Sequence, residues 1–146
     1  MRYPRHPKGA AFADNKRKYK NTKITYDGIE FDSKKEIKRY IELKDLEAAG
    51  KISSLELQKV YTLIPAQYEE TGEVYTKGKN AGKPKRGKCI EQAVTYKADF
   101  AYIDESGKQV VEDVKGYRDP ASGAYARYII KRKMMLYFYR IQIKEI

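Results

Sequence analysis

The expected fold rests on two stretches of the chain, Lys97-Ala98-Asp99-Phe100 and Val110-Val111-Glu112-Asp113-Val114-Lys115-Gly116. They predict two neighbouring strands, because both are rich in apolar residues and a short Gly-containing turn lies between them. Side chains alternate between the two faces of a strand. Asp113 and Lys115 are therefore expected on one face of the second strand, and Glu112 on the other.

The first of these strands brings a further carboxylate, Asp99, towards the face that carries Asp113. Two carboxylates this close repel each other unless a hard cation lies between them, and an all-oxygen site with open positions suits Mg²⁺. A lysine beside the metal, here Lys115, can orient or help to deprotonate the water that attacks a phosphodiester. The three residues together predict a nuclease that depends on Mg²⁺ or Mn²⁺.

An exposed ion pair on an edge strand is the simpler explanation for Asp113 and Lys115. The valines that flank them occur on both faces of the strand, which favours a central strand. Unpaired charge is costly in such a strand, so a chemical role explains the pair better. Asp99 lies between Ala98 and Phe100 in a largely apolar stretch, where a surface role is equally hard to accommodate.

The length and composition predict one soluble domain. A chain of 146 residues is long enough for one core. Its single cysteine, Cys89, excludes an internal disulfide and fits a reducing compartment, and its single histidine, His6, leaves no zinc cluster. No apolar run approaches the roughly 18–20 residues of a membrane span, and the charged N-terminus lacks an apolar signal core. We expect a cytoplasmic protein without a membrane partner.

The net charge of +11 is unevenly distributed. Residues 1–23 carry eight Lys/Arg and one Asp, and residues 77–88 carry six Lys/Arg and no acid. The remainder is nearly neutral, so two basic segments are attached to a balanced domain. This arrangement is typical of an enzyme that binds a polyanion such as DNA. A solubility tail and a solvated loop are the simpler alternative.

Apolar periodicity divides the chain into an arm and a domain. Residues 1–22 have none and predict a flexible basic arm. Residues 23–146 predict a single domain, interrupted by a basic Gly/Lys-rich loop insertion at about residues 66–89. The candidate DNA-binding residues of the arm and the loop are Arg17, Lys18, Lys83, Lys85, Arg86 and Lys88.

The start of the domain predicts a hairpin followed by a helix. Asp27-Gly28 between two short β-prone runs is a hairpin signal. Ser33 is a favourable N-cap residue, and Glu36, three residues later, completes a capping box. Gly50 ends the helical pattern. The later elements are expected as strands over residues 55–63, 90–103 and 109–115, a helix over 125–139 and a strand over 141–146.

That order, with Asp99 on the second strand and Asp113-x-Lys115 on the third, resembles the PD-(D/E)XK, or restriction-endonuclease-like, nuclease superfamily. The chain also resembles a phage-associated family known as a domain of unknown function. The matching motifs are Asp27-Gly28-Ile29-x-Phe31-Asp32-Ser33-x-x-Glu36 and Val111-Glu112-Asp113-Val114-Lys115-Gly116. The resemblance covers roughly residues 24–146. It implies an α-β-β-β-α-β core with a central mixed sheet flanked by helices.

The resemblance also implies roles for individual residues. Asp99 and Asp113 match the metal-binding acids of the superfamily, with the carbonyl of Val114 as a neighbouring ligand. Lys115 matches the catalytic lysine. Glu36 matches a first-helix glutamate that many members use as a further metal or water ligand, although the capping box explains it without any chemistry.

Gln58 and Lys131 are further candidate DNA contacts. The related families often carry a polar residue near the site on the strand before the metal strands, where Gln58 is expected. Lys131 belongs to the second helix, with Arg127 nearby. A solvent-facing position explains either residue equally well. Most of the fourteen tyrosines, Tyr96 and Tyr128 among them, are expected in or near the core.

The superfamily implies hydrolysis of DNA phosphodiesters. Small phage enzymes with this fold include Holliday junction resolvases, which act as homodimers on branched DNA, and the basic arm and loop fit such a substrate. One alternative is an endonuclease that acts on duplex or single-stranded DNA, similar to transposon or restriction nucleases. Another is an inactive nuclease-fold DNA-binding protein of a phage replication complex, although the complete set of Asp99, Asp113 and Lys115 weighs against it.

Overall fold

The computed structural model describes residues 23–115 and 119–146. The predicted arm over residues 1–22, with its candidate contacts Arg17 and Lys18, lies outside the described residues. Within the described part, no helix is long and apolar enough to cross a membrane.

The described chain begins with the expected hairpin. Strands β1 (Ile24–Tyr26) and β2 (Ile29–Phe31) pair in antiparallel fashion. Asp27 and Gly28 between them have φ angles of 53° and 73°. A tight turn with two positive φ angles twists in the same sense as the strands, which is why Asp-Gly is favoured there. The hairpin prediction is confirmed.

Helix α1 (Lys34–Ala48) begins with the predicted capping box. The backbone N–H of Glu36 donates to Ser33 Oγ at 3.2 Å. In return, Glu36 Oε1 accepts from the Ser33 hydroxyl at 2.9 Å, and Glu36 Oε2 accepts from the N–H of Asp32 at 3.1 Å. The cap satisfies amide groups that the first turn leaves without a helical partner, and so it fixes where the helix starts.

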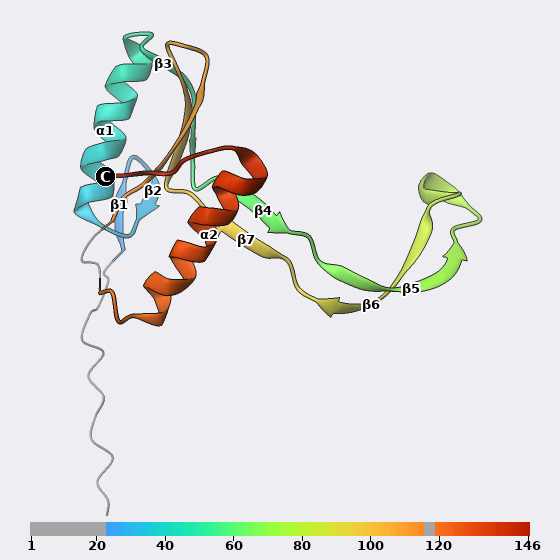
Figure 1. Cartoon of the computed structure of the whole chain (residues 1–146). Coiled ribbons are helices and arrows are strands. Elements are labelled where there is room, and N and C mark those ends of the chain that lie inside the picture. Colours follow the sequence, from blue (N-terminus) through green and yellow to red (C-terminus); the bar gives the residue numbers. More distant parts are fainter. Residues whose placement is uncertain (1–22, 116–118) are drawn as a thin grey trace, which may run out of the picture.

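A four-stranded mixed sheet forms the centre of the molecule, in the order β10-β9-β8-β3. Strands β3, β8 and β9 are antiparallel neighbours, and β10 pairs with β9 in parallel. Helix α1 packs on one face and helix α2 on the other (Figure 1). The chain is therefore a mixed α/β domain with two helices. The bounds are β3 (Ile52–Leu57), β8 (Phe100–Asp104), β9 (Gln109–Asp113), α2 (Gly123–Tyr139) and β10 (Lys144–Glu145).

Two clusters of buried side chains occupy the two faces of this sheet. The α1 cluster contains Tyr40, Leu43, Phe100 and Val114, and the α2 cluster contains Ala98, Val111 and Met135. Val111 and Val114 thus lie on opposite faces, as their odd and even positions predicted.

Two predicted strands are interrupted where they leave the central sheet. The expected strand over residues 55–63 is two strands, β3 and β4 (Val60–Ile64), because Gln58 adopts a left-handed conformation with φ 53°. The expected strand over 90–103 is likewise divided into the end of β6, then β7 (Val94–Lys97) and β8. Strands β4 and β7 pair with each other. In both segments the alternation of apolar residues continues through the breaks, so the sequence pattern does not reveal where one strand ends and the next begins.

The segment predicted as a loop insertion at residues 66–89 does leave the central sheet, but it consists of strands and not of loop. The segment forms a two-stranded antiparallel sheet of β5 (Gln67–Val74) and β6 (Pro84–Glu91), with a 3₁₀ turn at Gly78–Asn80. This β5–β6 ribbon projects away from the rest of the molecule (Figure 1). The glycines and lysines of this segment suggested a solvated loop. The two strands can nevertheless form without a hydrophobic core, because each provides hydrogen-bond partners for the backbone of the other.

Candidate active site

A cleft lies where the central sheet passes into the β4–β7 pair, between the first turns of α1 and α2. Its volume is about 400 Å³. It contains six of the residues that the sequence singled out: Glu36, Gln58, Asp99, Asp113, Lys115 and Lys131. The other lining residues are Asp32, Tyr96, Lys97, Ala124, Arg127 and Tyr128.

The strand register brings the two aspartates together. Phe100 of β8 pairs with Glu112 of β9 at the end of the antiparallel ladder. Asp99 and Asp113 are the next residues on the side of the cleft, where their side chains interact with each other. The predicted convergence of these two carboxylates is confirmed.

Asp99 is also anchored to the backbone of the Asp-x-Lys motif. Its Oδ2 accepts a hydrogen bond of 2.6 Å from the N–H of Val114. Burial, together with the neighbouring carboxylates of Asp113 and Glu36, raises the pKa of Asp99 to about 7, against the lowering effect of the Val114 N–H. Near neutral pH Asp99 is therefore about half protonated unless a cation neutralises it.

Asp113 lies at the centre of the contacts in the cleft. Lys115 Nζ lies 2.6 Å from Asp113 Oδ2, and the hydroxyl of Tyr96 donates to the same oxygen at 3.1 Å. Burial and the neighbouring Asp113 raise the pKa of Tyr96, so the hydroxyl stays a donor at neutral pH. The carboxylate is only 5% exposed, and it is held in place from two sides.

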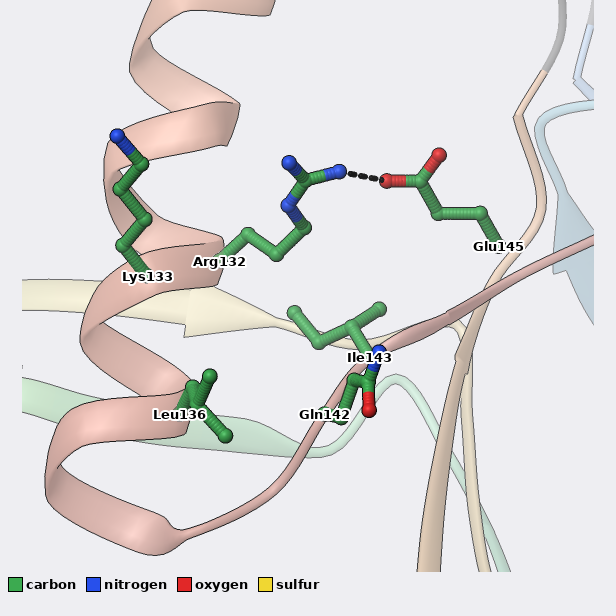
Figure 2. A pocket seen from close by; sticks show the side chains of 6 residues that line it. All are labelled: Arg132, Lys133, Leu136, Gln142, Ile143 and Glu145. Carbon is green, nitrogen blue, oxygen red and sulfur yellow. Dashed lines mark hydrogen bonds and ion pairs between the residues drawn. The ribbon is translucent and has the colours of Figure 1, made fainter.

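Lys115 is held by an aromatic ring as well as by Asp113. Its Nζ lies 3.9 Å from the ring centroid of Tyr128 on α2. The Tyr128 hydroxyl donates to Glu145 Oε1 at 2.9 Å, and Arg132 donates to the same oxygen at 2.7 Å. Figure 2 shows the Arg132–Glu145 pair bridging α2 and the C-terminal strand. The position of Lys115 thus depends on how α2 is docked.

Sequence reasoning missed Tyr96 and Tyr128 as residues of the site, since both were expected to be core residues. Both do pack with the α2 cluster. However, the hydroxyl of Tyr96 contacts Asp113, and the ring of Tyr128 contacts the ammonium group of Lys115. Nothing local in the sequence links a helix tyrosine to a lysine on a strand, because only the docking of α2 brings them together.

Basic side chains line the cleft beside the acidic pair. Arg127 and Lys131 stand four residues apart on α2 and so share one helix face, and Lys97 comes from the end of β7. The backbone N–H of Gln58 donates to the carbonyl of Asp99 at 3.0 Å, which places this residue at the same edge. Guanidinium and ammonium groups beside two carboxylates suit a phosphate group that approaches a bound cation.

The donor set fits Mg²⁺ with an incomplete protein cage. Asp99 and Asp113 offer two carboxylates, and the Val114 carbonyl belongs to the peptide between the motif residues. In residues 23–115 and 119–146, no three His, Cys, Asp or Glu side chains form a metal-holding group. Both oxygens of Glu36 accept hydrogen bonds of the cap, so its role as a ligand remains a prediction. Mg²⁺ usually keeps several waters and uses one or two carboxylates, and this set supplies two.

The basic residues predicted on the loop lie outside the cleft. Lys85 pairs with Glu73 across the ribbon at 2.8 Å, and the guanidinium of Arg86 lies 5.1 Å from the ring centroid of Tyr68. Lys83 and Arg86 line a separate hollow near the ribbon tip. Lys88 is an exposed residue of β6. The structure therefore separates these candidates from the acidic pair.

A search of curated proteins and a search of solved structures each found no match. A family model described as "Protein of unknown function (DUF1064)" matches residues 16–145. Since this range spans most of the 146 residues, the chain belongs to the DUF1064 family.

Proposed function

We propose that this protein is a metal-dependent DNA endonuclease of the PD-(D/E)XK type. The observation that carries the proposal is the position of Asp99 beside Asp113, with Lys115 in contact with Asp113. Burying two carboxylates against each other costs free energy, and a domain with so small a core gains nothing structural from it. A site that recruits a cation explains why the arrangement is kept.

The element order supports a restriction-endonuclease-like core as part of this proposal. The elements α1, β3, β8, β9, α2 and β10 follow one another as α-β-β-β-α-β once the β4–β7 pair and the β5–β6 ribbon are treated as an insertion. Asp99 directly precedes β8 and Asp113 ends β9, so both acids lie at the same end of the two central strands.

Each side chain of the cleft has a role in this proposal. A bound Mg²⁺ or Mn²⁺ supplies the positive charge that makes the phosphate electrophilic and acidifies a bound water. Asp99 and Asp113 would hold it, with the Val114 carbonyl as a further candidate oxygen. Lys115 orients the attacking water and balances the charge that develops on the phosphate. Tyr96 and Tyr128 are positioning residues that hold Asp113 and Lys115.

The basic residues of the cleft define the class of substrate. Lys97, Arg127 and Lys131 line the cleft, and in this proposal they contact phosphates on either side of the one that is cut, which orients a nucleic acid strand without reading its sequence. Branched DNA such as a Holliday junction, cut by a homodimer in phage recombination, remains the substrate that we place first. Duplex or single-stranded DNA is the alternative within the same chemistry.

A nuclease-fold protein that binds DNA without cutting it is the second candidate. The observation in its favour is that, among the described residues, Asp99 and Asp113 do not form a metal-holding group with a third His, Cys, Asp or Glu side chain. The two candidates differ in one respect that is easily measured, because only the enzyme needs a metal ion to change the DNA.

The test uses end-labelled four-way junction, flap, duplex and single-stranded DNA, each with Mg²⁺, Mn²⁺ or EDTA. We expect metal-dependent cleavage that leaves 5′ phosphates and disappears in Asp113→Asn. Asp45→Asn is the matched control, since Asp45 is an exposed aspartate of α1. Cleavage by folded Asp113→Asn at the wild-type rate would refute the site. Tight binding without cleavage under every metal condition would favour the second candidate.

A further inference from the structure

The β5–β6 ribbon has no evident structural purpose within the chain. It forms a two-stranded sheet of its own, and every residue of β5 is exposed. An isolated two-stranded hairpin is only marginally stable in water. Such an element is therefore best explained by a ligand that it contacts.

The net positive charge of the ribbon is concentrated at its tip, since basic and acidic residues are mixed on its paired strands. Residues 75–83 carry Lys77, Lys79 and Lys83 and no acidic residue, whereas the glutamates of the ribbon lie on its paired strands. Lys83 lines a hollow there together with Tyr75, Asn80, Pro84 and Arg86. Between Tyr75 and Pro84 the tip has no large apolar side chain, which argues against insertion into a membrane.

The ribbon is continuous with the candidate active site. Strand β4 begins two residues after Gln58, and β7 ends at Lys97, and both of these residues line the cleft. The β4–β7 pair leads from the cleft into the ribbon (Figure 1). A ligand that contacts both the cleft and the tip must therefore be extended, and the lysines at the tip require it to be anionic.

The ribbon is bent by shifts in its strand register, which occur at three places along the pair. Gly87 allows the closest approach, because a Cβ at this position would lie 2.8 Å from the carbonyl oxygen of Glu69. Bulges of this kind bend and twist a strand pair. A bent ribbon can follow a curved surface that a flat one would touch at only one point.

We propose that the β5–β6 ribbon is a clamp for duplex DNA. Two paired strands lie about 4.8 Å apart and fit a major groove about 12 Å wide. The eight residues of β5 extend about 26 Å, at about 3.3 Å per residue, which corresponds to about eight base pairs. Because the β4–β7 pair separates the ribbon from the cleft, the tip lysines contact backbone phosphates further along the duplex than the DNA held in the cleft. That last placement rests on the proposed function, whereas the clamp itself does not.

The first experiment measures DNA binding in EDTA, so that no cleavage occurs. A labelled 24-base-pair duplex is titrated with the full chain over a range of salt concentrations. The tip variant carries Lys77→Gln, Lys79→Gln and Lys83→Gln. The control variant has the same net charge and carries Lys38→Gln, Lys51→Gln and Lys108→Gln, which are exposed positions on the main body.

We expect the tip variant to bind more weakly than the control and to lose up to about 2.7 from the slope of log affinity against log salt, at about 0.9 per phosphate contact. Equal affinity and slope in the two variants would overturn the clamp. Single-stranded DNA and phosphatidylserine vesicles are measured in parallel. A loss confined to either of them, with duplex binding unchanged, would also overturn it.

A second variant removes the ribbon while keeping the domain. Residues 69–88 are replaced by Asn-Gly, which joins the paired residues Tyr68 and Cys89 through a tight turn. Thermal unfolding checks that the domain remains folded. We expect duplex affinity to fall at least as far as in the tip variant, and unchanged affinity of the folded protein would overturn the clamp.

The nuclease and the clamp can be refuted independently of each other. A wild-type chain that never cleaves DNA, but whose duplex binding depends on the ribbon tip, would refute the nuclease and support the clamp. A chain that cleaves DNA, but whose binding is indifferent to the ribbon, would refute the clamp and leave the nuclease in place.

Discussion

Glu112 and Asp113 are consecutive residues of β9, and their buried carboxylates face opposite sides of the sheet and opposite electrostatic surroundings. Glu112 receives two hydrogen bonds of 2.7 Å from Arg39 of α1 and one of 2.8 Å from the Tyr102 hydroxyl. Asp113 instead shares its surroundings with a second acid, Asp99. The Glu112 carboxylate is thus compensated by an arginine, whereas Asp113 is paired with Lys115 but lies beside a second buried acid.

The proposed chemistry requires both acids of the cleft and the lysine beside them. Asp99→Asn and Asp113→Asn should abolish metal-dependent cleavage, because each removes a charged oxygen ligand. Lys115→Ala should lower the rate by roughly 10²–10⁴-fold while metal binding is retained, since its role concerns water and phosphate. Single-turnover cleavage and a calorimetric metal titration separate the two effects. Loss of metal binding in Lys115→Ala would contradict this division of roles.

Stability in the absence of metal should report the repulsion between the acids. The pKa of Asp99 is raised from its ordinary 3.8 to about 7 in the folded protein. The folded state therefore holds a proton that the unfolded state releases, and this contribution is complete below pH 3.8 and is lost as the pH rises to about 7. Asp99→Asn should stabilise the protein at pH 8 and have little effect at pH 4. The test is to measure the melting temperatures of both proteins in EDTA between pH 4 and pH 8. A change in melting temperature that is the same at every pH would contradict the prediction.

The Arg39–Glu112 pair should have the opposite pH dependence. Burial alone would raise the pKa of Glu112, but hydrogen bonds from Arg39 and Tyr102 outweigh it and lower this pKa below 4.5. The stabilisation is therefore present above pH 4.5 and is lost as the pH falls below it. Arg39→Met should cost about 3–5 kcal/mol at pH 7, because it leaves a buried charge with too few partners. Denaturant unfolding should show that Arg39→Met combined with Glu112→Gln recovers much of this loss.

Glu36 can be tested separately as a helix cap and as a metal ligand. Glu36→Gln preserves the hydrogen bonds of a capping box but provides a poorer ligand, whereas Ser33→Ala removes the cap and should cost about 1 kcal/mol. If Glu36 binds metal, Glu36→Gln should reduce cleavage strongly with little change in unfolding, and Ser33→Ala should do the reverse. A fully active Glu36→Gln protein would leave Glu36 with its structural role alone.

The ring of Tyr128 should matter more than its hydroxyl. Tyr128→Phe keeps an aromatic face next to the Lys115 ammonium but loses the bond to Glu145, while Tyr128→Leu loses the face. We expect Tyr128→Phe to stay close to the wild-type rate and Tyr128→Leu to slow cleavage and shift its pH–rate profile. Equal losses in both variants would indicate that α2 docking, rather than the lysine, is affected.

Local patterns in the sequence were sufficient for the acidic pair. The two-residue period of a strand separated Asp113 and Lys115 from Glu112, and the turn before β9 set a register in which Asp99 meets Asp113. The capping box at Ser33 was equally local. These features depend on neighbours in the chain, which a single sequence displays directly.

Other features depend on contacts between distant segments and were not predictable. The partner of Glu112 is Arg39 on a helix far back in the chain, and the ring beside Lys115 comes from α2. Gln58 adopts a left-handed conformation and interrupts a strand, although no glycine or proline at this position indicates a break. The ribbon was misread because its lysines and glycines suggested a solvated loop, although each strand provides the other's backbone partners.

The separation of the β5–β6 ribbon from the central sheet has a consequence for how the family can vary. Because β4 and β7 pair at its base, residues added or removed further out leave the cleft undisturbed. Two residues inserted in each strand keep every side chain on its face and lengthen the ribbon by about 6.6 Å, or about two base pairs of duplex. On the two proposals, the ribbon would act as a ruler whose length sets the distance along the duplex between the phosphates that its tip contacts and the phosphate that is cut, and this distance would change in even steps of sequence.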